Sequence, residues 1–151
     1  MLDTKTINTT TENTVFLIDT NVLSELMREK PNYGVIDFFS KSHKMVISAV
    51  TIQELFFGYS SLPDNMISKK RKIIAFIETV IEKFDTTIVP ITINEARKAG
   101  DLQGFQKKNG RNLTYPDAAI AGTCLNLNAV LVTRNAKDFE HCDILVLNPF
   151  T

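Results

Sequence analysis

The stretch TVFLIDTNVLSEL, residues 14–26, places a carboxylate between one apolar segment and the start of a second. Residues 15–18 are apolar without interruption, which is typical of a strand buried on both faces, and Asp19 follows immediately. Asp19 has two interpretations. It caps the helix that begins after it, or it lies at the tip of a buried strand, where open α/β sheets bind their ligands.

The rest of the chain predicts where that strand belongs. Helical spacing of apolar residues alternates with further short runs rich in Val and Ile, which end at Ser48, near Ile91, at Thr133 and near Leu147. The expected helices cover residues 22–26, 52–59, 73–81, about 93–108 and about 116–126, with a break at 62–65 (LPDN). This alternation predicts one α/β domain, in which helices flank a central, mostly parallel twisted sheet.

The composition limits the class of protein. The chain has 151 residues, of which 44% are hydrophobic and 23% charged, an ordinary globular mixture. We expect residues 15–151 to form the domain and residues 1–14, with six threonines, to be a loose N-terminal extension and not a secretory signal. No apolar run approaches the roughly 20 residues of a membrane-spanning helix. Cys124 and Cys142 are too few for a disulfide framework, which favours a cytoplasmic location.

The charges balance overall but are unevenly distributed. Lys plus Arg and Asp plus Glu both number 17, so the net charge does not indicate a nucleic-acid-binding protein. Residues 69–111 nevertheless hold ten basic and five acidic side chains, which leaves seven and twelve for the remainder. The basic segment is either a surface that contacts phosphate beside an acidic site or a set of solvated helix faces.

Four acidic residues occupy equivalent places in the predicted fold. Asp19 follows the first strand, and Glu54 lies one turn into the helix after the second. Asp117 opens the helix at 116–126, and Asp138 follows the fourth strand. Because the carboxyl ends of parallel strands share one edge of the sheet, the four acids are expected to converge there. Clustered carboxylates repel one another unless a cation binds among them, and purely oxygen ligands favour Mg²⁺ or Mn²⁺.

Each acid also has a purely structural interpretation. Thr51 and Glu54 have the spacing of a helix capping box, and Thr92 and Glu95 repeat that spacing after the third strand. The repeat means that a capping box alone does not indicate function. Asp117, in the first turn of its helix, stabilises the helix dipole by about 0.3–1 kcal/mol wherever its side chain points. The fourth acid is compatible with an ordinary surface position.

Several motifs occur together in the order that characterises a known family, namely Asp19-Thr20-Asn21, SAVTIQEL (48–55), YPDAAIAG (115–122) and LVTRNAKDF (131–139). With LPDN (62–65) and NPF (148–150), they resemble the motifs of PIN-domain ribonucleases, above all the VapC and FitB-like toxins of bacterial type II toxin–antitoxin pairs. The resemblance covers about residues 15–150. It implies a Mg²⁺- or Mn²⁺-dependent endoribonuclease that cuts structured RNA, a homodimer, and a small cognate antitoxin that binds over the active site.

The resemblance also assigns roles to individual residues. The acidic metal site of the family matches Asp19, Glu54, Asp117 and Asp138. Asp19 and Asp117 are expected as principal metal ligands, and the other two acids as groups that bind a second ion or position water. Supporting or substrate-contacting positions are expected at Asn21, Thr133, Arg134 and Asn135. Asn135 stands where some relatives place an acid, so the fourth carboxylate is either Asp138 or weaker than in those relatives.

Two other functions compete with this interpretation. A non-catalytic binding or regulatory module would use the same acids only as helix caps. A receiver-like phosphoacceptor domain also gathers acids at strand ends, but it carries a Lys after a late strand, where this chain has Thr133 and Arg134. The sequence disfavours a zinc centre built on histidines, because His43 and His141 are the only two.

Overall fold

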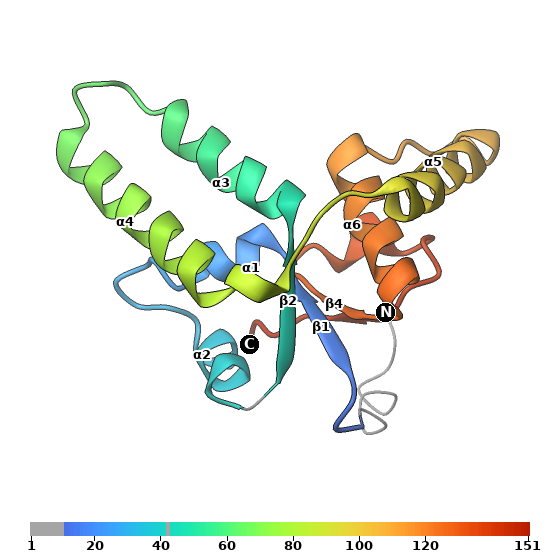
Figure 1. The fold of residues 1–151 in the computed structure, drawn as a ribbon, viewed down its shortest axis with the longest axis horizontal. Helices are drawn as coiled ribbons and strands as arrows, with labels where there is room; N and C mark the ends of the chain where they lie inside the picture. Colours follow the sequence, from blue (N-terminus) through green and yellow to red (C-terminus); the bar gives the residue numbers. More distant parts are fainter. Residues whose placement is uncertain (1–10, 42) are drawn as a thin grey trace.

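A five-stranded parallel sheet forms the centre of the protein, with the strand order β3-β2-β1-β4-β5 (Figure 1). The computed structural model describes residues 11–41 and 43–151. The strands are β1 (Val15–Ile18), β2 (Lys44–Ser48), β3 (Ile88–Val89), β4 (Val130–Val132) and β5 (Val146–Leu147). All five predicted strands are therefore confirmed, and so is their parallel arrangement.

Helices cover both faces of this sheet. They are α1 (Thr20–Glu25), α2 (Tyr33–Ser40), α3 (Ala49–Ser60), α4 (Ile67–Lys83), α5 (Ile93–Lys108) and α6 (Tyr115–Leu127), with short 3₁₀ turns η2 (Asp85–Thr87) and η3 (Ala136–Phe139). Figure 1 shows α3 and α4 side by side on one side of the sheet and α5 and α6 on the other. The α/β fold class predicted from the sequence is confirmed.

The central strand β1 is buried on both faces. Successive side chains of a strand point to opposite faces. Phe16 and Ile18 pack into a core formed with buried side chains of α1, α2, α3 and α4. Leu17 packs into a second core, formed largely by the small side chains of α6. The residue that follows, Asp19, is thus held at the end of a strand that packing fixes from both sides.

Close contact between α5 and α6 fixes the helix that carries Asp117. A Cβ atom at Gly122 would lie 2.8 Å from the backbone N of Ala99 and 2.8 Å from the backbone O of Glu95, so only glycine permits this approach. The buried Glu95 carboxylate accepts hydrogen bonds from the Thr92 backbone N–H and from Asn126 Nδ2, both 2.9 Å long. These contacts confirm the predicted capping box at the start of α5 and extend it to α6.

The second predicted capping box, at Thr51 and Glu54, is wrong. The helix starts earlier than the sequence pattern suggested, because Ser48 is its N-cap and accepts a 3.1 Å hydrogen bond from the Val50 N–H. Thr51 therefore lies within the helix, fully buried. Its hydroxyl has no hydrogen-bond partner among the described residues. Glu54 is left free of any capping role.

Helix α2 was not predicted. Asn32 caps it by accepting a 3.0 Å hydrogen bond from the Gly34 N–H, and Val35 and Phe38 bury its inner face. Of the predicted N-terminal extension, residues 1–10 lie outside the described residues. Residues 11–14 form a turn before β1, in which the Thr14 N–H donates to the Thr11 carbonyl at 2.9 Å.

Two further observations concern the chain as a whole. Within the described part of the chain, no helix combines the length and the apolar character needed to span a bilayer. Cys124 and Cys142 are both buried and neither forms a disulfide.

Candidate functional site

Asp19 is a buried carboxylate at the carboxyl end of β1. Its side chain is 9% exposed. Oδ1 accepts a hydrogen bond from the Thr20 N–H at 2.8 Å, which caps α1. Oδ2 accepts hydrogen bonds from Thr133 Oγ1 at 2.8 Å and from Asn21 Nδ2 at 3.2 Å. Asp19 therefore caps a helix and also stands at the tip of a central strand.

Asn21 connects the ends of β1 and β4. Its Nδ2 also donates to Thr133 Oγ1 at 3.2 Å, and its Oδ1 accepts from the Arg134 backbone N–H at 3.0 Å. The Asn135 backbone N–H donates to Thr133 Oγ1 at 3.1 Å. The polar residues expected beside the acids thus form one network around Asp19. Within it, Arg134 and Asn135 contribute backbone groups.

The side chain of Arg134 makes a different contact from the one expected. Its guanidinium lies 4.9 Å from the ring centroid of Phe150, a cation–π distance. Arg134 therefore does not point its charge at the acids in this structure. The contact of Arg134 with a substrate phosphate stays a prediction.

Glu54 reaches the same edge of the sheet from α3. Its Oε1 accepts a 3.2 Å hydrogen bond from Thr20 Oγ1, so a residue of the Asp19-Thr20-Asn21 motif contacts it directly. Burial raises the pKa of Glu54, and the charges of Asp19 and Asp117 raise it further. Glu54 is therefore close enough to Asp19 and Asp117 for their charges to act on it.

Asp117 lies in the first turn of α6, where Thr114 is the N-cap and its hydroxyl accepts from the Asp117 N–H at 3.4 Å. The pKa of the Asp117 carboxylate is raised by burial and then by the charges of Asp138 and Asp19, while a hydrogen bond from the Thr114 side chain opposes the increase. Thr114, and not Asp117, is thus the N-cap that holds the start of α6 and with it the position of Asp117.

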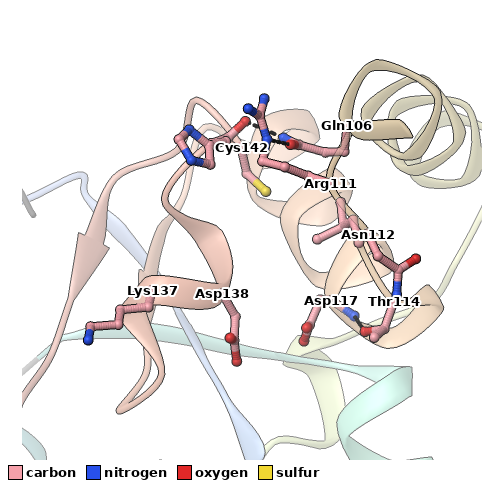
Figure 2. A pocket seen from close by; sticks show the side chains of 10 residues that line it. Gln106, Arg111, Asn112, Thr114, Asp117, Lys137, Asp138 and Cys142 are labelled. Carbon is pink, nitrogen blue, oxygen red and sulfur yellow. Dashed lines mark hydrogen bonds between the residues drawn. The ribbon is translucent and has the colours of Figure 1, made fainter. Parts of the chain in front are cut away.

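Asp138 lies in η3 and shares a pocket with Asp117 (Figure 2). Besides its effect on Asp117, its charge contributes to the raised pKa of Asp19, which is due first to burial. Asn135 is exposed, and only its backbone N–H enters the network. Of the two candidates for the fourth position, Asp138 is therefore the one that faces the other acids.

The four acids have no basic partner within residues 11–41 and 43–151. The ion pairs among the described residues join Arg28 to Glu25, Lys41 to Asp37 and Lys70 to Asp64, none of which belongs to the site. In the same part of the chain, no three Asp, Glu, His or Cys side chains lie close enough together to hold a metal ion. The site thus consists of carboxylates that repel one another and that form no ion pair with any described basic side chain.

The pocket beside the acids contains residues that the sequence did not single out. Its volume is about 490 Å³, and Gln106, Arg111 and Lys137 line it together with Asp117 and Asp138. The only signal in the sequence was the excess of basic residues at 69–111, of which Arg111 is the last. Thr20, which contacts Glu54, was likewise part of a quoted motif but was given no role.

These features define a class of protein: a parallel α/β domain with unpaired carboxylates at the carboxyl edge of its sheet. The model of the PIN domain family matches residues 16–145. The chain therefore belongs to the PIN domain family.

The chain is also similar to known proteins over about nine-tenths of its length. It is 26% identical to the VapC ribonuclease Y4jK of Sinorhizobium fredii over 140 residues, which cover 90% of this chain and 98% of that protein. It is also 26% identical to toxin FitB of Neisseria gonorrhoeae, over 90% of this chain and 99% of that protein. The crystal structure of FitAcB from Neisseria gonorrhoeae matches with a TM-score of 0.80 at 28% identity, covering 89% of this chain and 97% of that one.

Proposed function

We propose that this protein is an endoribonuclease and acts in the cytoplasm as the toxin of a toxin–antitoxin pair. The observation that carries the proposal is electrostatic: the charge of Asp19 raises the pKa of both Glu54 and Asp117, and the charge of Asp138 raises the pKa of both Asp19 and Asp117. Family membership and relatives named as ribonucleases and toxins support it.

The donor set fits a divalent cation. All four side chains are carboxylates, and the groups that hydrogen-bond to Asp19 and Glu54 are the hydroxyls of Thr20 and Thr133 and the amide of Asn21. Oxygen donors of this kind suit Mg²⁺ or Mn²⁺. A bound cation of this class supplies a hydroxide nucleophile at neutral pH and neutralises the charge that develops on the phosphate.

The residues take different roles in the proposed reaction. Asp19 and Asp117 would hold the cation, because they stand on rigid elements at the ends of β1 and the start of α6. Glu54 and Asp138 would orient water or a second ion from the two sides of the site. Asn21 and Thr133 fix the orientation of Asp19 through the hydrogen bonds described above.

The helix-cap alternative has lost most of its support. Glu54 belongs to no capping box, because Ser48 caps α3. The N-caps of α6 and η3 are Thr114 and Asn135, so neither Asp117 nor Asp138 occupies the cap position of its helix. Of the four acids, only Asp19 serves as a helix cap. Helix capping alone therefore does not explain why Glu54, Asp117 and Asp138 lie near Asp19.

The partners are inferred from the relatives. The related structures include FitAB bound to a DNA fragment, with a TM-score of 0.81 at 27% identity. We infer that this chain likewise forms a complex with a small antitoxin, and that it is a homodimer. Exposed apolar residues on α3 and at the start of α4 offer surface for such contacts, and they include Phe57, Met66 and Ile67.

The proposal is tested by incubating the purified, antitoxin-free protein with total cellular RNA and with structured RNAs. We expect cleavage with Mg²⁺ or Mn²⁺ that leaves 5′-phosphate ends, and none in excess EDTA. Asp117→Asn should lose at least about a hundredfold, roughly 2.7 kcal/mol of transition-state stabilisation. Asp101→Asn, an exposed acid on α5 with the same charge change, should cut like the wild type. Undiminished cleavage in EDTA by nuclease-free protein would contradict the proposal.

A further inference from the structure

The pocket next to the acids has two chemically different ends. Figure 2 shows Asp117 and Asp138 at one end, and Arg111 with Gln106 at the other. Its volume of about 490 Å³ falls in the range of about 300–1,000 Å³ that holds small organic ligands. The acids occupy only one end, so the remaining space and the basic end are unexplained by the proposed metal site.

A buried amide holds the side chain of Arg111. Gln106, near the end of α5, is only 3% exposed. Its Nε2 donates to the His141 carbonyl at 2.6 Å, and its Oε1 accepts from Arg111 Nε. One side chain thus fixes Arg111, in the loop before α6, against the segment that follows η3. A buried Gln with both ends of its amide satisfied restricts the guanidinium to a small set of orientations.

The rest of the guanidinium has no partner. Among residues 11–41 and 43–151, the two terminal nitrogens of Arg111 form no hydrogen bond, and no carboxylate lies within ion-pair distance. An arginine presents its donors in a planar fork that matches the oxygens of a phosphate. Arg111 therefore offers an oriented, unsatisfied fork at the end of the pocket away from the acids.

Charges at both ends of the pocket act on the same buried group. The pKa of the Cys142 thiol is raised by burial and then by Asp117, while Arg111 opposes the increase. Cys142 lines the pocket between them (Figure 2). The negative and positive ends are thus close enough to influence one sulfur, and a single extended ligand can contact both.

We propose that Arg111 binds a phosphate of the RNA chain that adjoins the phosphate being cut, and that Gln106 is its positioning residue. The pocket then accommodates one nucleotide between the two phosphates. The inference rests on the proposed ribonuclease function and adds to it the contact that sets the path of the RNA on one side of the scissile bond.

The test is the affinity of metal-free protein in EDTA for a fluorescein-labelled single-stranded RNA of mixed sequence, measured by fluorescence anisotropy. Arg111→Gln should bind about tenfold more weakly, the contribution of one charge-assisted hydrogen-bonded contact. Between about 50 and about 200 mM salt, the slope of log affinity against log salt should fall by about 0.7, the value for one phosphate contact on a single strand. Arg97→Gln is the matched control, because Arg97 is exposed on α5 outside the pocket.

Gln106 is tested through its dependence on Arg111. Gln106→Leu should weaken RNA binding in the wild-type background and add little in the Arg111→Gln background, because its effect passes through the guanidinium. Gln106→Glu, which pairs the guanidinium with a charge, should also weaken binding. A loss of the same size in both backgrounds, or unchanged affinity in both Gln106 variants, would overturn the positioning role.

The outcomes separate this inference from the proposed function. Arg111→Gln that binds with wild-type affinity and slope would contradict the inference even if the wild type cuts RNA. Equal losses in Arg111→Gln and Arg97→Gln would also contradict it, because they would indicate general electrostatic attraction. Weakened binding with a reduced slope, in a protein that never cuts RNA, would support the phosphate contact and refute the nuclease.

Discussion

Thr133 and Asp19 are 114 positions apart in the chain, yet the Thr133 hydroxyl donates a 2.8 Å hydrogen bond to Asp19 Oδ2. The bond joins the ends of β1 and β4, which are neighbours in the sheet. Thr133 is fully buried, so Asp19 is oriented by a group that water cannot replace. The orientation of the central acid thus depends on the pairing of two strands.

The first prediction concerns this hydrogen bond. Thr133→Val keeps the shape but removes the donor, so it should destabilise the protein by about 1–3 kcal/mol, the cost of an unmet bond to a charged group. At roughly 2–4 °C per kcal/mol, the melting temperature should fall measurably. Cleavage should drop about tenfold, or 1.4 kcal/mol.

The control for this variant is Thr123→Val. Thr123 is equally buried, but its hydroxyl bonds only to the Ala119 carbonyl within α6. It should lose less stability and keep its cleavage rate. If the two valine variants melt and cut alike, the bond to Asp19 has no special role.

The second prediction concerns Thr51, whose buried hydroxyl has no partner among the described residues. Thr51→Val removes a polar group whose desolvation is uncompensated, at nearly constant volume. It should therefore leave stability unchanged or raise it by up to about 1–2 kcal/mol, unlike Thr133→Val. Thermal melting of both variants checks this. A large destabilisation in Thr51→Val would show that its hydroxyl has a partner.

The third prediction separates Glu54 from Glu95. Glu54 faces other acids, whereas Glu95 is buried with donors from Thr92 and Asn126. Glu54→Gln should lose at least about tenfold in cleavage with no loss of stability. Glu95→Gln places an amide N–H against those donors and should destabilise by about 1–3 kcal/mol, while the folded protein still cuts normally. If Glu95→Gln lost cleavage and Glu54→Gln cut normally, the site would not lie at Glu54.

The fourth prediction is a pH dependence in the absence of metal. The pKa of Asp117 is raised above its ordinary value of 3.8, first by burial. Its contribution to stability is therefore fully present below pH 3.8 and is lost as the pH rises through the raised value. In EDTA near neutral pH, Asp117→Asn should melt higher than the wild type, because it carries no charge there. The difference should shrink as the pH falls toward 3.8.

Melting curves of the two proteins across this pH range check the prediction. Addition of Mn²⁺ at neutral pH should reverse the order, since only the wild type gains a bound ion. A variant that melts below the wild type in EDTA at neutral pH would show that the Asp117 charge is not repelled in the folded protein.

The strands and the positions of the acids were predictable, because both rest on local patterns. An uninterrupted apolar run such as residues 15–18 indicates a strand buried on both faces. An acid directly after such a strand therefore lies at the carboxyl edge of the sheet. The start of α3 was misplaced for the same local reason. Ser48 and Thr51 are both acceptable caps by composition, and only the packing of the strand end selects Ser48.

The pocket was not predictable in the same way. Gln106 occupies an ordinary helical position in the sequence, yet its side chain is buried and hydrogen-bonds to the carbonyl of His141, which lies 35 residues away. Arg111 was one of ten basic residues in its segment, and nothing local distinguished it. Helix α2 was not predicted because it is short and follows Pro31 and Asn32, a pair that also indicates a turn.

The most direct test of the account is calorimetric titration of the metal-free protein with Mn²⁺, since the central claim is that the acids at the end of the sheet form a divalent cation site. The wild type and Asp101→Asn should bind Mn²⁺ stoichiometrically, and Asp117→Asn should lose that binding. If the wild type shows no stoichiometric binding, or if Asp117→Asn binds Mn²⁺ as the wild type does, the carboxylates do not form the proposed site.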